Sequence, residues 1–252
     1  MNTMRSFLTL ALLTQVWLGN AQVYFNRQID WENDFEYHVG ISVFDSAKYV
    51  LLAGGDFKLT PLAKNFLVTK MTTAGDLLWS KTFVPRPGAF GNTASMVKIN
   101  DEYSLIHGNV EIPNDTGYYV YHFFIIKIRN ATGDTIWSKE IGNPLVEESG
   151  LRIISSADGG FALSGYFAPP GNTQFSKLLL LKIDSLGNQV FRKEYTSDAG
   201  KNHQDFSLVQ TPDGGYLILA YRSYNGPYPG GLGNINKIDW VMVKTDSQGN
   251  QQ

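Results

Sequence analysis

The fold is decided by a stretch that occurs four times, and its first copy is FLVTKMTTAGDLLWSKTF at residues 66–83. The later copies are FFIIKIRNATGDTIWSKEI at 123–141, LLLLKIDSLGNQVFRKEY at 178–195 and WVMVKTDSQGNQQ at 240–252. Each copy has an apolar run, a lysine and a turn with Gly-Asp or Gly-Asn, and the first three add an aromatic residue followed two positions later by lysine. A pattern repeated at a nearly fixed spacing indicates one structural unit used four times.

A second block lies upstream of the first in every copy, and its four versions are DSAKYVLLAGG, NDEYSLIHGN, ADGGFALSGY and PDGGYLILAY. In two of them Asp-Gly-Gly precedes the aromatic residue, at 158–160 and 213–215. Asp-Gly between alternating apolar residues predicts a β-hairpin, because the turn needs a positive φ that glycine adopts at little cost. Each unit is therefore expected to hold two hairpins, which give four antiparallel strands named A to D.

In the third copy we expect strands A to D at Leu151–Ser155, Phe161–Gly165, Lys177–Ile183 and Gln189–Tyr195. Strand C is apolar at consecutive positions, as in a strand buried on both faces. Four-stranded sheets that are covered on both faces and repeat about every 57 residues are typical of a β-propeller, so the predicted fold is all-β with four antiparallel blades. A parallel β-helix is the alternative, but its repeats are shorter and lack paired hairpin turns.

The segment Val23–Ile29 matches strand D of a unit, with Phe25 at the aromatic position and Arg27 at the lysine position. The last copy stops at Gln252, where its own strand D should begin. Propellers remove exposed sheet edges by pairing strands from opposite ends of the chain. We therefore expect Val23–Ile29 to close a ring, either of these four blades or of a larger propeller whose N-terminal part is 22–252.

Residues 1–21 have the pattern of a secretory signal peptide, with Arg5, the apolar run Phe7–Leu18 and small residues up to Ala21. The apolar run has about 12 residues, fewer than the roughly 20 that cross a bilayer. We therefore expect export with cleavage near Ala21, a secreted or cell-surface location and no membrane insertion. The export route and the oligomeric state are left open by the sequence.

The composition is typical of a protein with many short strands, and it excludes some classes of binding partner. Charged residues make up 17% of the chain, below the usual quarter, and there are 25 Gly and 10 Pro. The net charge of −2 provides no field that would attract nucleic acid or anionic lipid. The absence of cysteine excludes disulfides, thiol catalysis and thiolate metal sites.

The combined motif, Asp-Gly-Gly-aromatic, then apolar-Lys-x-Asp-x-x-Gly-Asn, then aromatic-x-Lys, resembles the repeats of secreted propeller-like proteins of Bacteroidetes. The match is clearest at Asp158–Gly165 with Lys182–Lys193, and the first two copies depart from it by lacking Gly-Gly. The resemblance implies a propeller and export, often by type IX secretion through a C-terminal sorting domain that is absent from this sequence. It implies no single activity, since propellers host many unrelated functions.

Gly-Asp-x-x-Trp, at 75–79 and 133–137, is similar to the docking motif of quinoprotein propellers, in which the indole wedges between blades. This similarity implies a structural role for Trp79 and Trp137 between sheets, because large aromatic rings contribute most to inter-sheet burial. No cofactor is expected.

Function is expected in the connections that emerge on one side of the sheets, between strands B and C and between successive units, because these vary in length and composition. The B–C connections are predicted at Asp56–Asn65, Asn109–His122, Phe167–Ser176 and Arg222–Asp239. Tyrosine offers a large contact area and a hydroxyl, which suits glycan or protein partners. The predicted binding residues are Tyr118, Tyr119, Tyr121, Tyr224, Tyr228 and His203.

The sequence contains no recognisable catalytic or metal-binding motif. The histidines occupy different repeat positions, and there is no H-x-x-x-H pair and no G-x-S-x-G elbow; they are His38, His107, His122 and His203. Glu147-Glu148 could form an acid–base pair, but adjacent carboxylates usually belong to a solvated loop. The aspartates that recur at turns are interpreted as caps of backbone amides, and they are Asp158, Asp184, Asp213 and Asp246.

The predicted function is therefore an exported binding or cell-surface interaction module, without a cofactor, that acts through the connections on one face. One alternative is a secreted hydrolase or lyase that acts on polysaccharide at the same face. A second alternative is a structural segment of a larger surface protein. An enzyme would need several acidic or histidine side chains from different blades to converge at that face.

Overall fold

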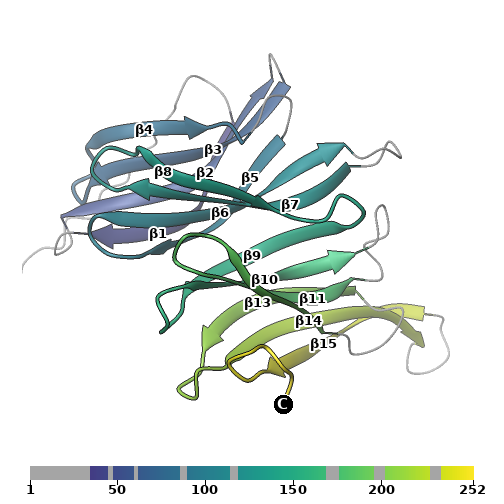
Figure 1. Ribbon diagram of the computed structural model, residues 1–252. Coiled ribbons are helices and arrows are strands. Elements are labelled where there is room, and N and C mark those ends of the chain that lie inside the picture. The colour runs from purple at the N-terminus through teal and green to yellow at the C-terminus, as the bar shows by residue number, and fades with distance from the viewer. Residues whose placement is uncertain are drawn as a thin grey trace, which may run out of the picture.

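The computed structural model describes residues 35–44, 48–59, 62–85, 90–113, 119–168, 176–195, 202–227 and 234–252. The expected signal peptide at 1–21 and the expected closing strand Val23–Ile29 lie outside the described residues. Within these ranges the chain forms strands and turns and no helix (Figure 1). The all-β class predicted from the repeats is confirmed.

The strands form four antiparallel sheets, one for each sequence repeat. The first sheet contains β1 (Phe35–Phe44), β2 (Tyr49–Leu59), β3 (Leu62–Thr72) and β4 (Leu77–Phe83). The second contains β5 (Phe90–Lys98), β6 (Tyr103–Pro113), β7 (Tyr119–Arg129) and β8 (Thr135–Ile141). The third contains β9 (Glu147–Ser155), β10 (Phe161–Ala168), β11 (Lys177–Ile183) and β12 (Gln189–Tyr195). The fourth contains β13 (Asn202–Gln210), β14 (Tyr216–Pro227) and β15 (Asn234–Lys244), followed by a single bridge between Thr245 and Gln251.

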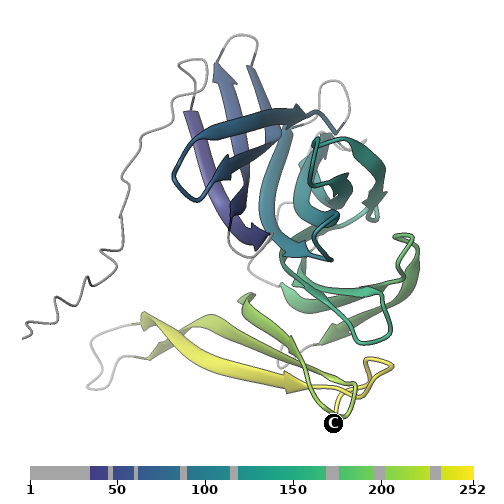
Figure 2. The same cartoon turned by 90° about the vertical axis from the view of Figure 1, so that its left-hand side faces the viewer.

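The sheets follow one another face to face in chain order (Figures 1 and 2). Their first strands are neighbours in succession, since β1 contacts β5, β5 contacts β9 and β9 contacts β13. The first strands therefore lie on the inner side of the array, and β4, β8 and β12 lie on the outer side. The arrangement is propeller-like, but the described strands do not close into a ring (Figure 2).

The strand bounds predicted for the third copy agree with the structure at one end of its sheet and differ at the other. In the third sheet β11 and β12 have the predicted bounds, whereas β9 begins at Glu147 and β10 continues to Ala168. The connections predicted at Asp56–Asn65, Asn109–His122 and Arg222–Asp239 are wrong, because most of each is paired strand. The physical reason is that a ladder satisfies the backbone polar groups of two long hairpin arms whatever side chains they carry.

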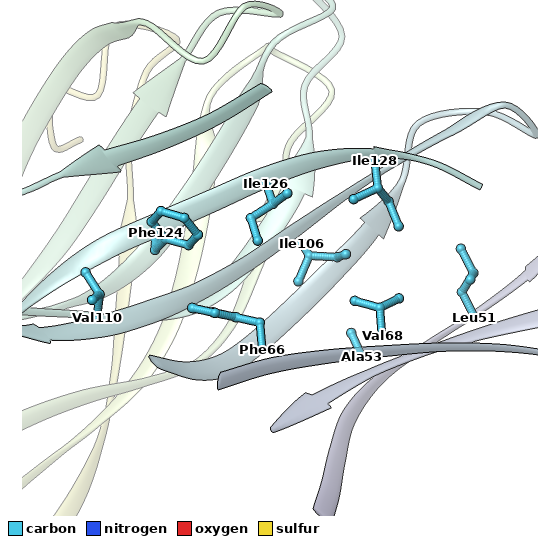
Figure 3. Packing of buried hydrophobic residues seen from close by; sticks show 9 residues of the cluster. All are labelled: Leu51, Ala53, Phe66, Val68, Ile106, Val110, Phe124, Ile126 and Ile128. Atoms are coloured by element: carbon cyan, nitrogen blue, oxygen red, sulfur yellow. The ribbon is translucent and has the colours of Figure 1, made fainter. Parts of the chain in front are cut away.

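The core consists of three apolar layers, one between each pair of successive sheets. Side chains along the third strand of a sheet alternate between the two layers beside it. In β7, Phe124 and Ile126 face the first sheet, whereas Phe123 and Ile125 face the third. Figure 3 shows the first layer, in which the rings of Phe66 and Phe124 lie 5.3 Å apart. The prediction of a strand buried on both faces is confirmed.

A second contact joins the sheets, and we call it the aromatic–glycine joint: an aromatic side chain of the fourth strand lies on a turn glycine of the next sheet. The pairs are Trp79 on Gly133, Trp137 on Gly187 and Phe191 on Gly249. A β-carbon on these glycines would lie 2.9, 2.9 and 2.7 Å from the ring, closer than a real side chain approaches. The predicted structural role of Trp79 and Trp137 is confirmed.

The lysine two residues after the aromatic position extends the joint to a polar partner. Lys81 Nζ lies 2.7 Å from Asp134 Oδ1, and Lys193 Nζ donates to Asn250 Oδ1 at 3.1 Å. Exposed contacts of this kind contribute about 0–1 kcal/mol each. These polar contacts therefore add little to the joint.

The repeated lysine at the end of the third strand has a role that the sequence did not reveal. In the third sheet Lys182 Nζ donates to Asp158 Oδ1 at 3.0 Å, and in the fourth Lys244 Nζ donates to Asp213 Oδ2 at 2.7 Å. A β-carbon at Gly160 would lie 2.4 Å from the Lys182 ammonium. The Asp-Gly-Gly turn thus supplies both the carboxylate and the space for the lysine.

The first two copies lack Asp-Gly-Gly, and their lysines contact aromatic rings. Lys70 Nζ lies 4.6 Å from the centroid of the Tyr49 ring, and Lys127 Nζ lies 4.8 Å from that of Tyr103. Cation–π contacts of this kind are attractive at such distances. The departure of the first two copies from the motif therefore coincides with a change of partner for the same lysine.

The variant Gly187→Ala is expected to be less stable than Gly159→Ala. Both glycines have positive φ, 81° and 82°, so alanine strains either backbone by about 1–2 kcal/mol. Only at Gly187 would the new methyl group meet the Trp137 ring, which adds about 1–3 kcal/mol of overpacking, whereas nothing lies within 4 Å of a β-carbon at Gly159. Urea unfolding of the two variants measures the difference, and equal midpoints would contradict the joint.

Candidate functional site

The two ends of each sheet differ in chemistry. One end, which we call the turn end, holds the tight turns between the first and second strands and between the third and fourth strands. At this end the repeated aspartates bond to their own turns. Asp184 Oδ1 accepts from the backbone N–H groups of Leu186 and Asn188 at 2.9 and 2.8 Å. Asp246 accepts an equivalent pair, and Asp158 and Asp213 each accept one backbone N–H. The capping role predicted for these four aspartates is confirmed.

The opposite end, which we call the loop end, buries ionisable side chains. Glu147 and Glu148, the first residues of β9, are 7% and 2% exposed. His122, in β7 of the second sheet, is 6% exposed. The expectation that Glu147-Glu148 lie in a solvated loop is wrong, because both residues belong to a strand that pairs with β10 and contacts the second sheet.

Glu148 is held by an arginine of the fourth strand of its own sheet. Arg192 Nη2 donates to Glu148 Oε1, while Nη1 donates to Glu194 Oε1. The guanidinium also lies over the Phe167 ring, 5.2 Å from its centroid. Burial raises the pKa of the Glu148 carboxyl, and the charge of Arg192 opposes this rise. The guanidinium is thus fixed in position by two carboxylates and a ring.

A pocket of about 160 Å³ lies beside this ion pair. Its lining comes from the end of the second sheet and the link that follows it, and from two strands of the third sheet. The lining residues are Ile141, Gly142, Asn143, Glu148, Gln189 and Arg192. A molecule in this pocket would therefore contact two successive repeats.

His122 lies against one wall of the pocket. Its Nδ1 is 2.8 Å from Glu140 Oε1, and its Nε2 is buried with no hydrogen-bond partner among the described residues. The Cδ2 edge of the ring packs on Gly142, where a β-carbon would lie only 2.3 Å away. Glycine at this position therefore allows the imidazole to approach the backbone that lines the pocket.

Glu147 belongs to a separate group of acidic and phenolic side chains. Tyr166 Oη donates to Glu147 Oε1 at 3.1 Å. Burial raises the pKa of the Glu147 carboxyl; the hydrogen bond from Tyr166 opposes the rise, and the charge of Glu111 adds to it. The pKa of Tyr121 is also raised, by burial and by the charges of Glu111 and Glu147. Carboxylates and tyrosines from the second and third sheets are thus close enough to influence one another.

The predicted binding residues are only partly brought together. Tyr119 and Tyr121 lie in β7, where Tyr119 is 52% exposed and Tyr121 is partly buried close to the carboxylate of Glu147. Tyr224 lies in β14 and His203 in β13, although both residues were expected in connections. The remaining two, Tyr118 and Tyr228, lie outside the described residues.

His107 is the most deeply buried ionisable ring and belongs to the core. It is fully buried in β6 and stacks on Phe123 with the ring centroids 5.5 Å apart. Burial lowers the pKa of His107 to about 4, so the imidazole is neutral at pH 7. Within the described ranges, no group of three or more histidine, aspartate or glutamate side chains is placed to hold a metal ion.

Sequence reasoning missed Arg192 as a member of the site, although the repeat contained a signal for it. The residue between the aromatic and the lysine of the fourth strand is Ser80 in the first copy and Ser138 in the second, but Arg192 in the third. A residue that departs from the repeat serves a purpose that the other copies do not share. Glu140 carried no comparable signal, because the third copy also has glutamate, Glu194, at the same position of the repeat.

Comparisons with known proteins leave the family of this chain open. No protein-family model matches it, and no curated protein matches it. Among solved structures it is similar to a mannose phosphorylase from Leishmania mexicana, determined with a phosphate ion, at 10% sequence identity and a TM-score of 0.44. The alignment covers 86% of this chain and 70% of that one. No helix that could cross a bilayer occurs in the part of the chain that the structure describes.

The variant Glu147→Gln is expected to be more stable than the wild type at neutral pH, by about 1 kcal/mol. A raised pKa means that the folded state binds the proton more tightly than the unfolded chain, so stability falls as the pH rises through the folded pKa. Glutamine removes the buried charge and keeps an acceptor for Tyr166. Urea unfolding at pH 7 and pH 4 measures the effect; the gain should shrink at pH 4, and a loss at pH 7 would contradict the assignment.

Proposed function

We propose that this chain is an exported β-propeller module that binds a ligand at its loop end. The observation that carries the proposal is the burial of Glu147, Glu148 and His122 at this end, with Glu148 lining a pocket. Burying an ionisable side chain costs free energy unless it is well paired, and strongly perturbed groups cluster at functional sites. The turn-end carboxylates, in contrast, are occupied by their own turns. Tyr119, exposed at the same end, adds contact area.

We propose further that the four sheets are blades of one ring, closed by the segment Val23–Ile29 as the fourth strand of the last sheet. β15 pairs with β14 along one edge, and the described residues place no full strand along its other edge. Ile238 and Met242, on the face of β15 turned away from the core, are 65% and 70% exposed. Ile41, in the first strand of the first sheet, is 66% exposed. Closure would bury apolar surface at both ends of the array.

The three complete sheets supply the register for this closing strand. In each, the lysine of the third strand stands opposite the aromatic residue of the fourth, as Lys182 does opposite Phe191. The same register would put Phe25 opposite Lys244 and Arg27 opposite Met242 if the segment closes the ring. Phe25 would then lie on Gly75, the turn glycine of the first sheet, whose φ is 90°. Gln251, bridged to Thr245, corresponds to Gln189 of the third sheet, so the closing strand would pair from Phe25 onward.

The cysteine-free chain allows a direct test of this register. In the double variant Arg27→Cys/Met242→Cys the two side chains would face each other, at the roughly 4.5–5.5 Å between β-carbons of directly opposed residues. Mild oxidation should therefore give an intramolecular disulfide in most molecules, visible as faster migration on a non-reducing gel. The control Asn26→Cys/Met242→Cys moves one cysteine to the other face of the strand and should remain reduced.

Two outcomes of this experiment would overturn closure within one chain. Disulfide-linked dimers would mean that the segment pairs with β15 of a second copy. Equal reactivity of the two double variants would mean that the segment is not held in this register.

The binding proposal is tested on arrays of glycans and of extracellular proteins probed with the full chain. A hit should weaken at least tenfold in Tyr119→Ala, because truncating a central aromatic contact costs about 2 kcal/mol or more. The matched control is Leu186→Ala, which removes an exposed apolar side chain in a hairpin turn at the turn end and should leave binding unchanged. Silence across both arrays would favour the purely structural role.

The second candidate function is a hydrolase or lyase that acts on polysaccharide at the loop end. Its support is Glu147, a buried carboxyl with a raised pKa that is bonded to Tyr166 and lies near a second carboxylate. A general acid needs a raised pKa of this kind. Release of new reducing ends from array glycans by the wild type, and its loss in Glu147→Gln, would establish this activity in place of simple binding.

A further inference from the structure

We propose that the pocket beside Glu148 and Arg192 binds a neutral, hydroxyl-bearing ligand the size of one sugar residue. The inference rests on the proposed binding function and names the ligand class for one part of the loop end. The pocket holds about 160 Å³, whereas a single water needs roughly 10–15 Å³ of such space, so it has room for a small ring-shaped molecule. Four of its six lining residues stand on paired strands of the second and third sheets, and the other two, Gly142 and Asn143, lie in the link between these sheets.

The charges around the pocket disfavour an anion. Three carboxylates gather here, on Glu140, Glu148 and Glu194, with Arg192 and Lys177 as the permanent cations. These three carboxylates outnumber the two permanent cations, so an anionic ligand is disfavoured. An added ammonium group would have to compete with cations that are already in contact with these carboxylates.

The hydrogen-bonding groups that line the pocket suit hydroxyls. Gln189 carries a neutral amide that can donate and accept, and the amide of Asn143, whose Oδ1 accepts from the backbone N–H of Leu145, has two N–H donors. Glu148 offers carboxylate oxygens, and Arg192 has five N–H donors of which two are used by Glu148 and Glu194. A hydroxyl both donates and accepts, so it can bond to every one of these groups. Ile141 adds an apolar surface against which the C–H face of a sugar ring can pack.

The polar groups are also fixed before a ligand arrives. The guanidinium of Arg192 is held by two carboxylates and by the Phe167 ring, which Lys177 also contacts from 5.5 Å. Groups that are already ordered lose little conformational entropy on binding, and this favours affinity for a small ligand.

The test uses the full chain and a panel of glucose, galactose, mannose and xylose, with a linear tetrasaccharide of each. Binding to each sugar is measured by saturation-transfer NMR and by calorimetry. At least one neutral sugar should bind, and glucuronate should bind at least tenfold more weakly than glucose. Tighter binding of the tetrasaccharide would identify a residue within a glycan chain as the ligand, and equal binding would identify the free sugar. Glucuronate or glucosamine binding more tightly than every neutral sugar would overturn the ligand class.

The variant Gln189→Trp fills the pocket from the edge of β12 and should weaken the binding of the sugar at least tenfold. Its matched control is Val190→Trp, which adds the same ring at the next residue, exposed and outside the pocket lining. If the chain binds an array in a way that depends on Tyr119, but Gln189→Trp weakens the binding of no sugar, the ligand class is wrong and the proposed function stands. If neither the arrays nor the panel gives binding, both proposals fail.

Discussion

Successive sheets of this protein are aligned by an aromatic side chain that lies on a glycine with positive φ. The apolar layers between the sheets supply most of the buried surface, but cores of aliphatic side chains tolerate rearrangement when their volume is kept. The aromatic–glycine joint is stricter, because the ring of Trp137 occupies space that any β-carbon at residue 187 would need. It therefore sets how far one sheet slides along the next. The loop-end side chains stand at the far ends of the same strands, so their mutual positions depend on this alignment.

The parts of the fold that could be predicted from the sequence are those encoded by nearby residues. Turn glycines and alternating apolar positions lie within a few residues of each other, and they gave the bounds of β11 and β12 correctly. The loop end was predicted poorly, because pairing of long hairpin arms depends on two segments that both look like connections. Pro113 opposite Tyr119 is an example, since proline and tyrosines beside a polar stretch suggested a loop. Several tyrosines assigned to loops consequently belong to strands.

The candidate site was harder to predict than the fold, because each of its contacts joins residues that are distant in the sequence. Glu148 and Arg192 are 44 residues apart, and nothing near either one announces the other. Such pairs are hard to recognise in a repeat, because the pattern is defined by the residues that the copies share. The site uses positions at which the copies differ. Arg192 stands where two other copies have serine, and His122 lies near the start of the third strand of the second sheet. The differences between the copies therefore carry the sequence signal for the site.

The repeated lysine of the third strand has different partners in the two halves of the chain. The two kinds of contact respond differently to acid. In the third and fourth sheets the partner is a carboxylate. Lys244 holds the pKa of Asp213 well below its usual range, and Lys182 does the same for Asp158 against the effect of burial. A lowered pKa means that the stabilisation is present above the usual range and is lost as the pH falls through the folded value. In the first two sheets the partner is a phenol ring, which gains no proton in acid. One repeated position thus carries an acid-sensitive contact in the third and fourth sheets and a contact indifferent to acid in the first and second.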